Sequence, residues 1–179
     1  MNLPNKLTVL RVCMVPVFVI LMLWEDLGDA GRYAAAAVFI IASATDWLDG
    51  YLARKNHLVT DFGKFMDPIA DKLLVCSAMI CLVEQEALAA WIVIIIIGRE
   101  FIISGFRLVA SDKGTVIAAS YWGKFKTVFQ MIMVILLILD LGGIFDTLAE
   151  IVTWIALILT VVSLVDYLRK NWHVLDGEM

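Results

Sequence analysis

Residues 45–71 read TDWLDGYLARKNHLVTDFGKFMDPIAD, and they separate two long apolar runs. Residues spaced i, i+3, i+4 and i+7 share one face of a helix, and Asp46, Asp49, Gly50 and Ala53 have this spacing. Asp67 and Asp71, spaced i and i+4, share a face of the next helix. Because only a short polar connection joins the two helices, this stretch predicts that four carboxylates converge at one end of a helix pair.

The composition predicts a membrane protein. Of the 179 residues, 62% are apolar and 18% are charged, whereas a soluble domain is typically about 45–50% apolar and about 25% charged. The length fits one domain over residues 1–179. The net charge of −4 argues against a nucleic acid as partner.

Six segments are apolar enough to cross a bilayer, whose core of about 30 Å requires about 20 apolar residues in a helix. They are 7–24, 31–52, 68–82, 88–110, 122–141 and 148–168. The sequence therefore predicts an all-α, polytopic protein with six transmembrane helices in a lipid bilayer.

The charges between these segments predict the orientation. Twelve of the fourteen basic residues fall on one side, and the exceptions are Arg32 and Arg99. The other side is acidic, with residues such as Glu25, Glu84 and Asp146. The positive-inside rule makes the basic side cytoplasmic, so we expect both termini and the 45–71 stretch at the cytoplasmic face.

The four carboxylates predict a metal site. They would repel one another without a cation, and charges near hydrocarbon are normally paired or functional. Hard oxygen donors suit Mg²⁺ or Mn²⁺, and four aspartates around two metal ions are typical of a clamp for phosphate or diphosphate. Arg54 and Lys64 can neutralise further phosphate oxygens. The alternative is a charge network in which the acids pair with Arg54, Lys64 and Lys72.

The same positions resemble the signature of the CDP-alcohol phosphatidyltransferases. The match comprises Asp46, Asp49, Gly50, Ala53, Arg54, Gly63, Asp67 and Asp71. The resemblance implies an integral membrane enzyme that moves a phosphatidyl group from CDP-diacylglycerol to an alcohol and releases CMP. It also implies a possible homodimer, since dimers are common in that family.

The resemblance further implies a role for each matching residue. Asp46, Asp49, Asp67 and Asp71 are expected to bind the metal ions, and Asp71 is also expected to be the general base. Gly50 and Ala53 are expected to leave room for the cytidine diphosphate of CDP-diacylglycerol. Arg54 and Thr60 are expected to contact it.

Basic residues in the second half of the chain suggest an anionic acceptor. Arg107, Lys124 and Lys126 are predicted near the cytoplasmic end, although attraction to anionic lipids also explains such residues. Arg99 and Glu100 lie deep in the fourth segment, where they either pair within the bundle or contact substrate.

The stretches around these basic residues, and residues 4–11, resemble the bacterial phosphatidylglycerophosphate synthases, which use sn-glycerol 3-phosphate. By this resemblance we expect Asn5 and Thr8 to bind CDP-diacylglycerol, and the protein to lie in a bacterial-type cytoplasmic membrane.

Two alternatives remain open at this point. The same chemistry can use another acceptor, such as serine, inositol phosphate or phosphatidylglycerol. A cation transporter would instead need acidic residues along a path across the membrane, whereas these cluster at one face.

Overall fold

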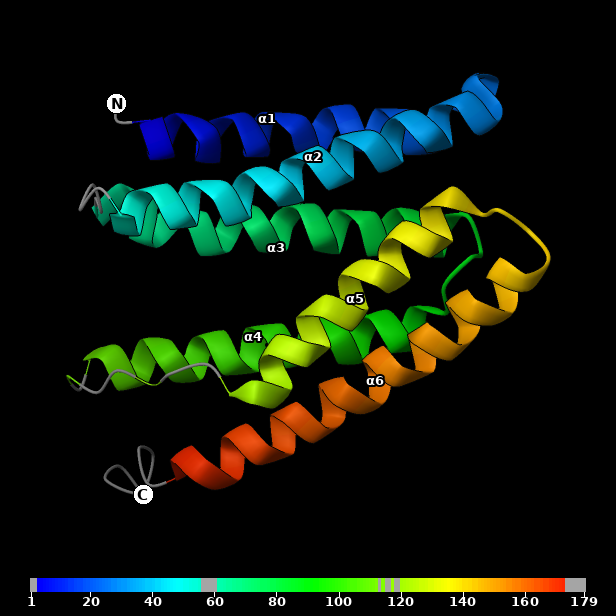
Figure 1. Cartoon of the computed structure of the whole chain (residues 1–179). Coiled ribbons are helices and arrows are strands. Elements are labelled where there is room, and N and C mark those ends of the chain that lie inside the picture. Colours follow the sequence, from blue (N-terminus) through cyan, green and yellow to red (C-terminus); the bar gives the residue numbers. More distant parts are fainter. Residues whose placement is uncertain (1–2, 56–60, 113, 115–116, 118–119, 173–179) are drawn as a thin grey trace. The chain divides into compact units, whose positions relative to one another are not determined.

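A computed structural model describes residues 3–55, 61–112, 114, 117 and 120–172, without the side chains of 3–5, 46–55, 61–65, 67, 68 and 112. This part of the chain is helical, which confirms the predicted all-α class (Figure 1). The elements are α1 (Leu3–Leu23), the 3-10 turn η1 (Glu25–Leu27), α2 (Gly28–Lys55), α3 (Asp61–Glu84), α4 (Ala90–Asp112), α5 (Tyr121–Leu139) and α6 (Ile144–Asn171).

Each predicted apolar segment lies on one of these helices, and the largest difference in bounds concerns α3. The apolar run begins at residue 68, whereas the helix begins at Asp61. Hydropathy marks only the part of a helix that suits lipid. It therefore misses residues 61–67, where the charged residues Asp61, Lys64 and Asp67 alternate with apolar ones. As a result, both Asp67 and Asp71 lie on α3.

Three helices in the described part of the chain are long and apolar enough to cross a membrane. Their apolar segments are Lys6–Leu23 in α1, Tyr121–Leu139 in α5 and Ile144–Asn171 in α6. In α4, by contrast, the charged residues Arg99, Glu100 and Arg107 interrupt the apolar sequence. The three apolar helices support association with a membrane.

The chain divides into two compact units. The first unit contains α1, η1, α2, α3 and the end of α5, Val134–Asp140. The second contains α4, the first part of α5, and α6.

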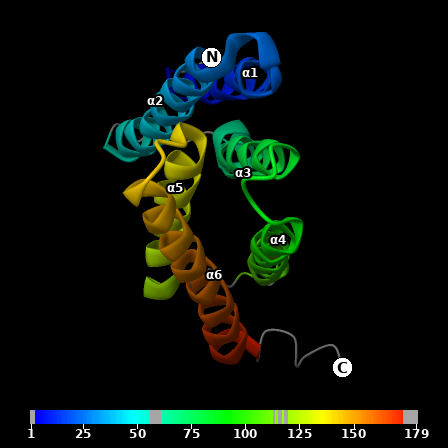
Figure 2. The ribbon, with the colours of Figure 1, turned by 90° about the vertical axis from the view of Figure 1, so that its right-hand side faces the viewer.

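In the first unit, α1 packs against both α2 and α3, and α2 runs antiparallel to the other two helices (Figures 1 and 2). The rings of Phe18 on α1 and Phe39 on α2 are buried, with centroids 5.9 Å apart. Ala35 and Ala36 are also buried, and small residues at such a contact let helix backbones approach closely. We call the end where α1 begins, α2 ends and α3 begins the motif end, and the opposite end the η1 end.

Basic residues of this unit gather towards the motif end, and the η1 end is mainly acidic. Lys6 and Arg11 lie towards the motif end, whereas Glu25, Asp26 and Glu84 lie at the η1 end. Arg32, one of the two exceptions to the charge pattern, forms an ion pair of 2.5 Å with Asp140. A local acidic partner therefore accounts for this basic residue on the acidic side.

In the second unit, α4 packs against α6. Phe106 on α4 meets the buried Tyr167 on α6 edge to face, with ring centroids 6.0 Å apart, and Ile103 and Ala110 complete this cluster. Arg99, the second exception to the charge pattern, is also buried in this unit.

Candidate functional site

The structure makes both halves of the aspartate stretch helical. Positions 46, 49, 50 and 53 belong to the last ten residues of α2, and positions 67 and 71 belong to the first half of α3. α2 and α3 contact each other within the first unit. The periodicity from which a shared face was predicted therefore applies to both segments.

Most of the predicted side chains in this stretch lie outside the described residues. This holds for Asp46, Asp49, Gly50, Ala53, Arg54 and Asp67, while Thr60 falls in the 56–60 gap. Asp71 is described and is half-buried on α3. Among the side chains that are described, no three His, Cys, Asp or Glu residues form a group that could hold a metal ion. The convergence of the four carboxylates therefore stays a prediction.

The start of α1 contributes two buried polar side chains near this stretch. Thr8 is fully buried, whereas the side chain of Asn5 is outside the described part. Arg11 is 1% exposed, and its Nε donates a hydrogen bond of 3.3 Å to the carbonyl oxygen of Ala42 on α2. Ala42 precedes Asp46 by one helical turn. The guanidinium of Arg11 therefore lies against α2 one turn before Asp46, the first of the four predicted metal ligands.

Sequence reasoning treated Arg11 only as a marker of the cytoplasmic side. The sequence did contain a signal of a further role for Arg11. A charge within a helix that is long and apolar enough to cross a membrane is costly and is usually functional. Only the packing of α1 against α2 shows that the Arg11 side chain contacts α2 just before Asp46.

The second unit contains a cluster of three charged side chains and one serine, contributed by three helices. Arg99 and Glu100 lie on α4, Lys126 on α5 and Ser163 on α6. Arg99 donates from Nε to Ser163 Oγ over 3.1 Å, and from Nη1 to Glu100 Oε1 over 3.0 Å. Lys126 donates from Nζ to the same carboxylate oxygen. We call these four residues the charged cluster.

The three predicted acceptor residues have different environments. Lys126 is buried in the charged cluster, whereas Arg107 and Lys124 are exposed. The Arg107 guanidinium lies 5.9 Å from the centre of the Tyr167 ring, and the Lys124 ammonium lies 5.4 Å from that of Tyr121. Such cation–π contacts orient the basic groups while leaving them accessible to water.

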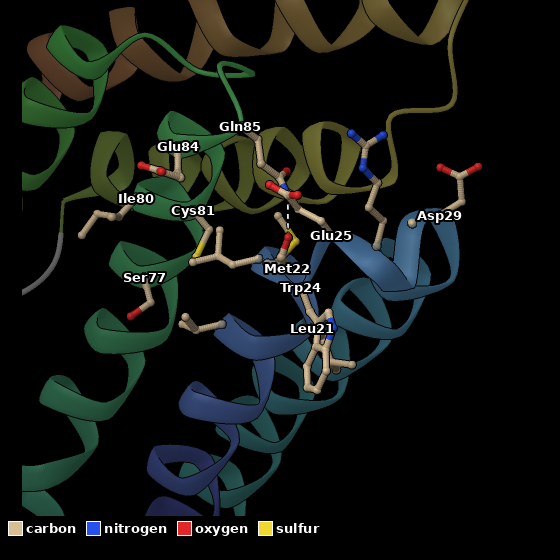
Figure 3. Close-up of a pocket in the computed structure, with 14 residues that line it drawn as sticks. Leu21, Met22, Trp24, Glu25, Asp29, Ser77, Ile80, Cys81, Glu84 and Gln85 are labelled. Carbon is tan, nitrogen blue, oxygen red and sulfur yellow. Dashed lines mark hydrogen bonds between the residues drawn. The ribbon is translucent and has the colours of Figure 1, made fainter.

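A cavity of about 770 Å³ opens at the η1 end of the first unit. Its walls come from the end of α1, η1, the start of α2 and the end of α3 (Figure 3). Gln85 bridges it by donating from Nε2 to the Met22 carbonyl over 2.6 Å. The cavity is lined by none of the predicted site residues. The carboxylates of Glu25 and Glu84 in its lining would repel a diphosphate.

The chain matches the sequence model of the CDP-alcohol phosphatidyltransferase family over residues 1–162. It belongs to that family. The matched range includes both aspartate pairs and three members of the charged cluster, Arg99, Glu100 and Lys126.

Three relatives with curated names are similar over nearly the whole chain. A Bacillus subtilis protein named CDP-diacylglycerol–glycerol-3-phosphate 3-phosphatidyltransferase is 47% identical, with 97% of each chain covered. A Haemophilus influenzae protein of the same name is 40% identical over 94% of this chain and 92% of its own. A Mycobacterium tuberculosis protein named probable phosphatidylglycerophosphate synthase is 41% identical over 98% of this chain and 84% of its own.

The residues of the family signature fit a divalent metal ion. Four carboxylates supply the hard oxygen ligands that Mg²⁺ and Mn²⁺ prefer, and their positions lie on two helices that contact each other within one unit. The i, i+3 and i, i+4 spacings place each pair on one helix face. Asp46, Asp49, Asp67 and Asp71 are therefore a suitable set of ligands.

Proposed function

We propose that this protein transfers the phosphatidyl group from CDP-diacylglycerol to sn-glycerol 3-phosphate, giving phosphatidylglycerophosphate and CMP in phospholipid biosynthesis. The observation that carries the proposal is the 47% identity, over 97% of both chains, to the Bacillus subtilis protein whose name states this reaction. The family match and the aspartate stretch support the donor half of the reaction, and the basic residues of the second unit support an anionic acceptor.

The donor half is assigned to the first unit. Gly50 and Ala53 leave room on α2 for the cytidine diphosphate, which Arg54 and Thr60 contact together with Asn5 and Thr8. The four signature aspartates would hold a pair of Mg²⁺ or Mn²⁺ ions, which would supply positive charge to the diphosphate and to CMP as the leaving group.

The reaction is a direct displacement. The acceptor hydroxyl oxygen attacks the phosphorus that carries the diacylglycerol, and the bond from that phosphorus to the CMP oxygen breaks. CMP leaves with the bonding electron pair, while the proton of the hydroxyl passes to Asp71. A carboxylate is a weak base at neutral pH, so the alignment of the two substrates supplies much of the rate.

The acceptor half is assigned to the second unit, where Arg107, Lys124 and Lys126 bind the phosphate of the acceptor. Burial strengthens the electrostatic contribution of Lys126, because a charge shielded from water interacts through a lower effective dielectric constant. Arg107 and Lys124 are exposed, and they attract the anion from solvent.

We further propose that the protein crosses a bacterial-type cytoplasmic membrane with six transmembrane helices and has both termini in the cytoplasm. In this proposal residues 1–179 form a single domain, and the protein assembles as a homodimer. The concentration of basic residues towards the motif end of the first unit supports the orientation. The pairing of Arg32 with Asp140 and of Arg99 with Glu100 supports it too, because both exceptions to the charge pattern have acidic partners.

An acceptor assay tests this function. The purified protein, in detergent micelles with CDP-diacylglycerol and Mg²⁺ or Mn²⁺, is given sn-glycerol 3-phosphate, serine, inositol phosphate or phosphatidylglycerol, and CMP release is measured. We expect release with sn-glycerol 3-phosphate alone. Release with only one of the other acceptors would disprove the acceptor assignment, and no release with any of them would count against the enzyme proposal as a whole.

A further inference from the structure

One carboxylate holds two basic groups together in the charged cluster. Glu100 Oε1 accepts hydrogen bonds from both Arg99 Nη1 and Lys126 Nζ. The side chains of Arg99 and Lys126 are 9% and 1% exposed, whereas that of Glu100 is 21% exposed. Two buried cations are therefore linked through a single carboxylate that is itself within reach of solvent.

Arg99 is fixed from more than one direction. Ser163 on α6 accepts from its Nε, and Glu100 accepts from its Nη1. A Cβ atom at Gly123 on α5 would lie 3.1 Å from Arg99 Nη2, so the guanidinium would have to move by a few tenths of an ångström. Glycine at this position therefore leaves room for the guanidinium. The helices α4, α5 and α6 together set the orientation of Arg99.

Glu100 also changes the charge that these residues present. Without it, Arg99 and Lys126 would be two like charges in a site of low water content, where their repulsion is weakly screened. With it, the three side chains carry one net positive charge, and the Lys126 ammonium has a defined position. A buried group of paired charges contributes little net stability. Removing one of its charges is nevertheless strongly destabilising, because the remaining charges stay buried without that partner.

We propose that Glu100 is a positioning residue for the acceptor: it holds the Lys126 ammonium and the Arg99 guanidinium in the arrangement that receives the phosphate of an anionic alcohol. The inference rests on the proposed function, in which Lys126 binds that phosphate. Glu100 itself does not touch the reacting atoms. It acts through Lys126 and Arg99, so its removal should raise KM for the acceptor much more than KM for CDP-diacylglycerol.

The first test is a double-mutant cycle on KM. Glu100→Gln keeps the shape of the side chain and removes its charge, which weakens the two hydrogen bonds that it accepts from charged groups. We expect KM for sn-glycerol 3-phosphate to rise about tenfold or more, with KM for CDP-diacylglycerol changed less than about twofold. In a Lys126→Met background, Glu100→Gln should raise the acceptor KM by a clearly smaller factor, because only the part of its effect that passes through Arg99 remains.

Glu150→Gln is the matched control, because it makes the same change at an exposed carboxylate on α6 of the same unit. Its KM values should equal those of the unaltered protein. An acceptor KM for Glu100→Gln that is unchanged or lower would overturn the inference. Equal factors in the two backgrounds would also overturn it, because they would mean that Glu100 does not act through Lys126.

A second pair of variants keeps the inference testable if Glu100→Gln does not fold. Gly123→Ala places a methyl group against Arg99 without altering any charge, whereas nothing described lies within 4 Å of a Cβ at Gly105. We expect Gly123→Ala to raise the acceptor KM selectively and Gly105→Ala to leave it unchanged. Equal acceptor KM values for these two variants would contradict the positioning of Arg99.

The outcomes also separate this inference from the proposed function. If the unaltered protein releases CMP only with an uncharged acceptor, the proposed function fails, and the inference fails with it. If it uses sn-glycerol 3-phosphate and Lys126→Met raises KM while Glu100→Gln does not, the inference alone fails.

Discussion

The burial of Lys126 predicts that two neighbouring lysines differ greatly in their effect on the acceptor. Lys126 is 1% exposed within the charged cluster, whereas Lys124, two residues earlier, is exposed beside Tyr121. Replacing each lysine by methionine removes the charge and preserves much of the length of the side chain. The two variants therefore compare the same chemical change in a buried and in an exposed environment.

The expected magnitude follows from Coulomb's law. Two unit charges about 4 Å apart interact by about 4 kcal/mol at an effective dielectric constant of about 20, and by about 1 kcal/mol in bulk water. Lys126 also forms an ion pair with Glu100, which reduces its attraction for the acceptor phosphate. We therefore take about half of the 4 kcal/mol, about 2 kcal/mol, as the contribution of Lys126. Lys126→Met should then raise KM for sn-glycerol 3-phosphate about thirtyfold, and Lys124→Met about fivefold or less.

Steady-state CMP release at saturating CDP-diacylglycerol gives the KM for sn-glycerol 3-phosphate of each variant. Repeating the measurement at increasing salt distinguishes a buried charge from an exposed one. At about 1 M salt the Debye length falls to about 3 Å, and exposed charges are largely screened. The effect of Lys124→Met should therefore disappear, while that of Lys126→Met should persist. Equal effects of the two variants, or an effect of Lys126→Met that vanishes with salt, would refute the argument from burial.

Three further predictions concern the first unit. Asp71→Asn should lower kcat about 10²–10⁴-fold, the usual contribution of a general base, while much of the CDP-diacylglycerol binding remains; near-normal transfer would rule out the assigned role. Chelation with EDTA should abolish CMP release, and Mg²⁺ or Mn²⁺ should restore it; full activity in EDTA would exclude the metal proposal. Gly31→Ala should lower the thermal midpoint in detergent by the equivalent of about 1–3 kcal/mol, because a Cβ there would lie 2.8 Å from the Leu21 carbonyl oxygen. Gly105→Ala is the control, and an equal midpoint in both would contradict this prediction.

The regular part of the candidate site was predictable from local information. The spacing of Asp46 and Asp49, and of Asp67 and Asp71, gives a shared face as soon as each segment is helical, and both segments are. The signature in this stretch also led to the family whose sequence model matches residues 1–162. Local patterns succeed here because helix periodicity and the length of a membrane span depend on neighbouring residues alone.

The acceptor side was less predictable, because it depends on which helices meet. Arg107, Lys124 and Lys126 look alike in sequence, yet Lys126 is buried and the other two are exposed. Ser163 and Gly123 gave no signal of their own, since a serine or a glycine in a membrane-length helix is common. Their relation to Arg99 appears only when α4, α5 and α6 are assembled.

The sequence by itself determined the helical class, the six apolar segments, the separation of charge and the aspartate signature. Each of these follows from composition and from spacing along one chain. Only the tertiary structure decided that Arg11 reaches the Ala42 carbonyl one turn before Asp46, and that Glu100 joins Arg99 to Lys126. Charges buried in apolar surroundings require partners. In a bundle most of those partners come from other helices, and their identity depends on packing.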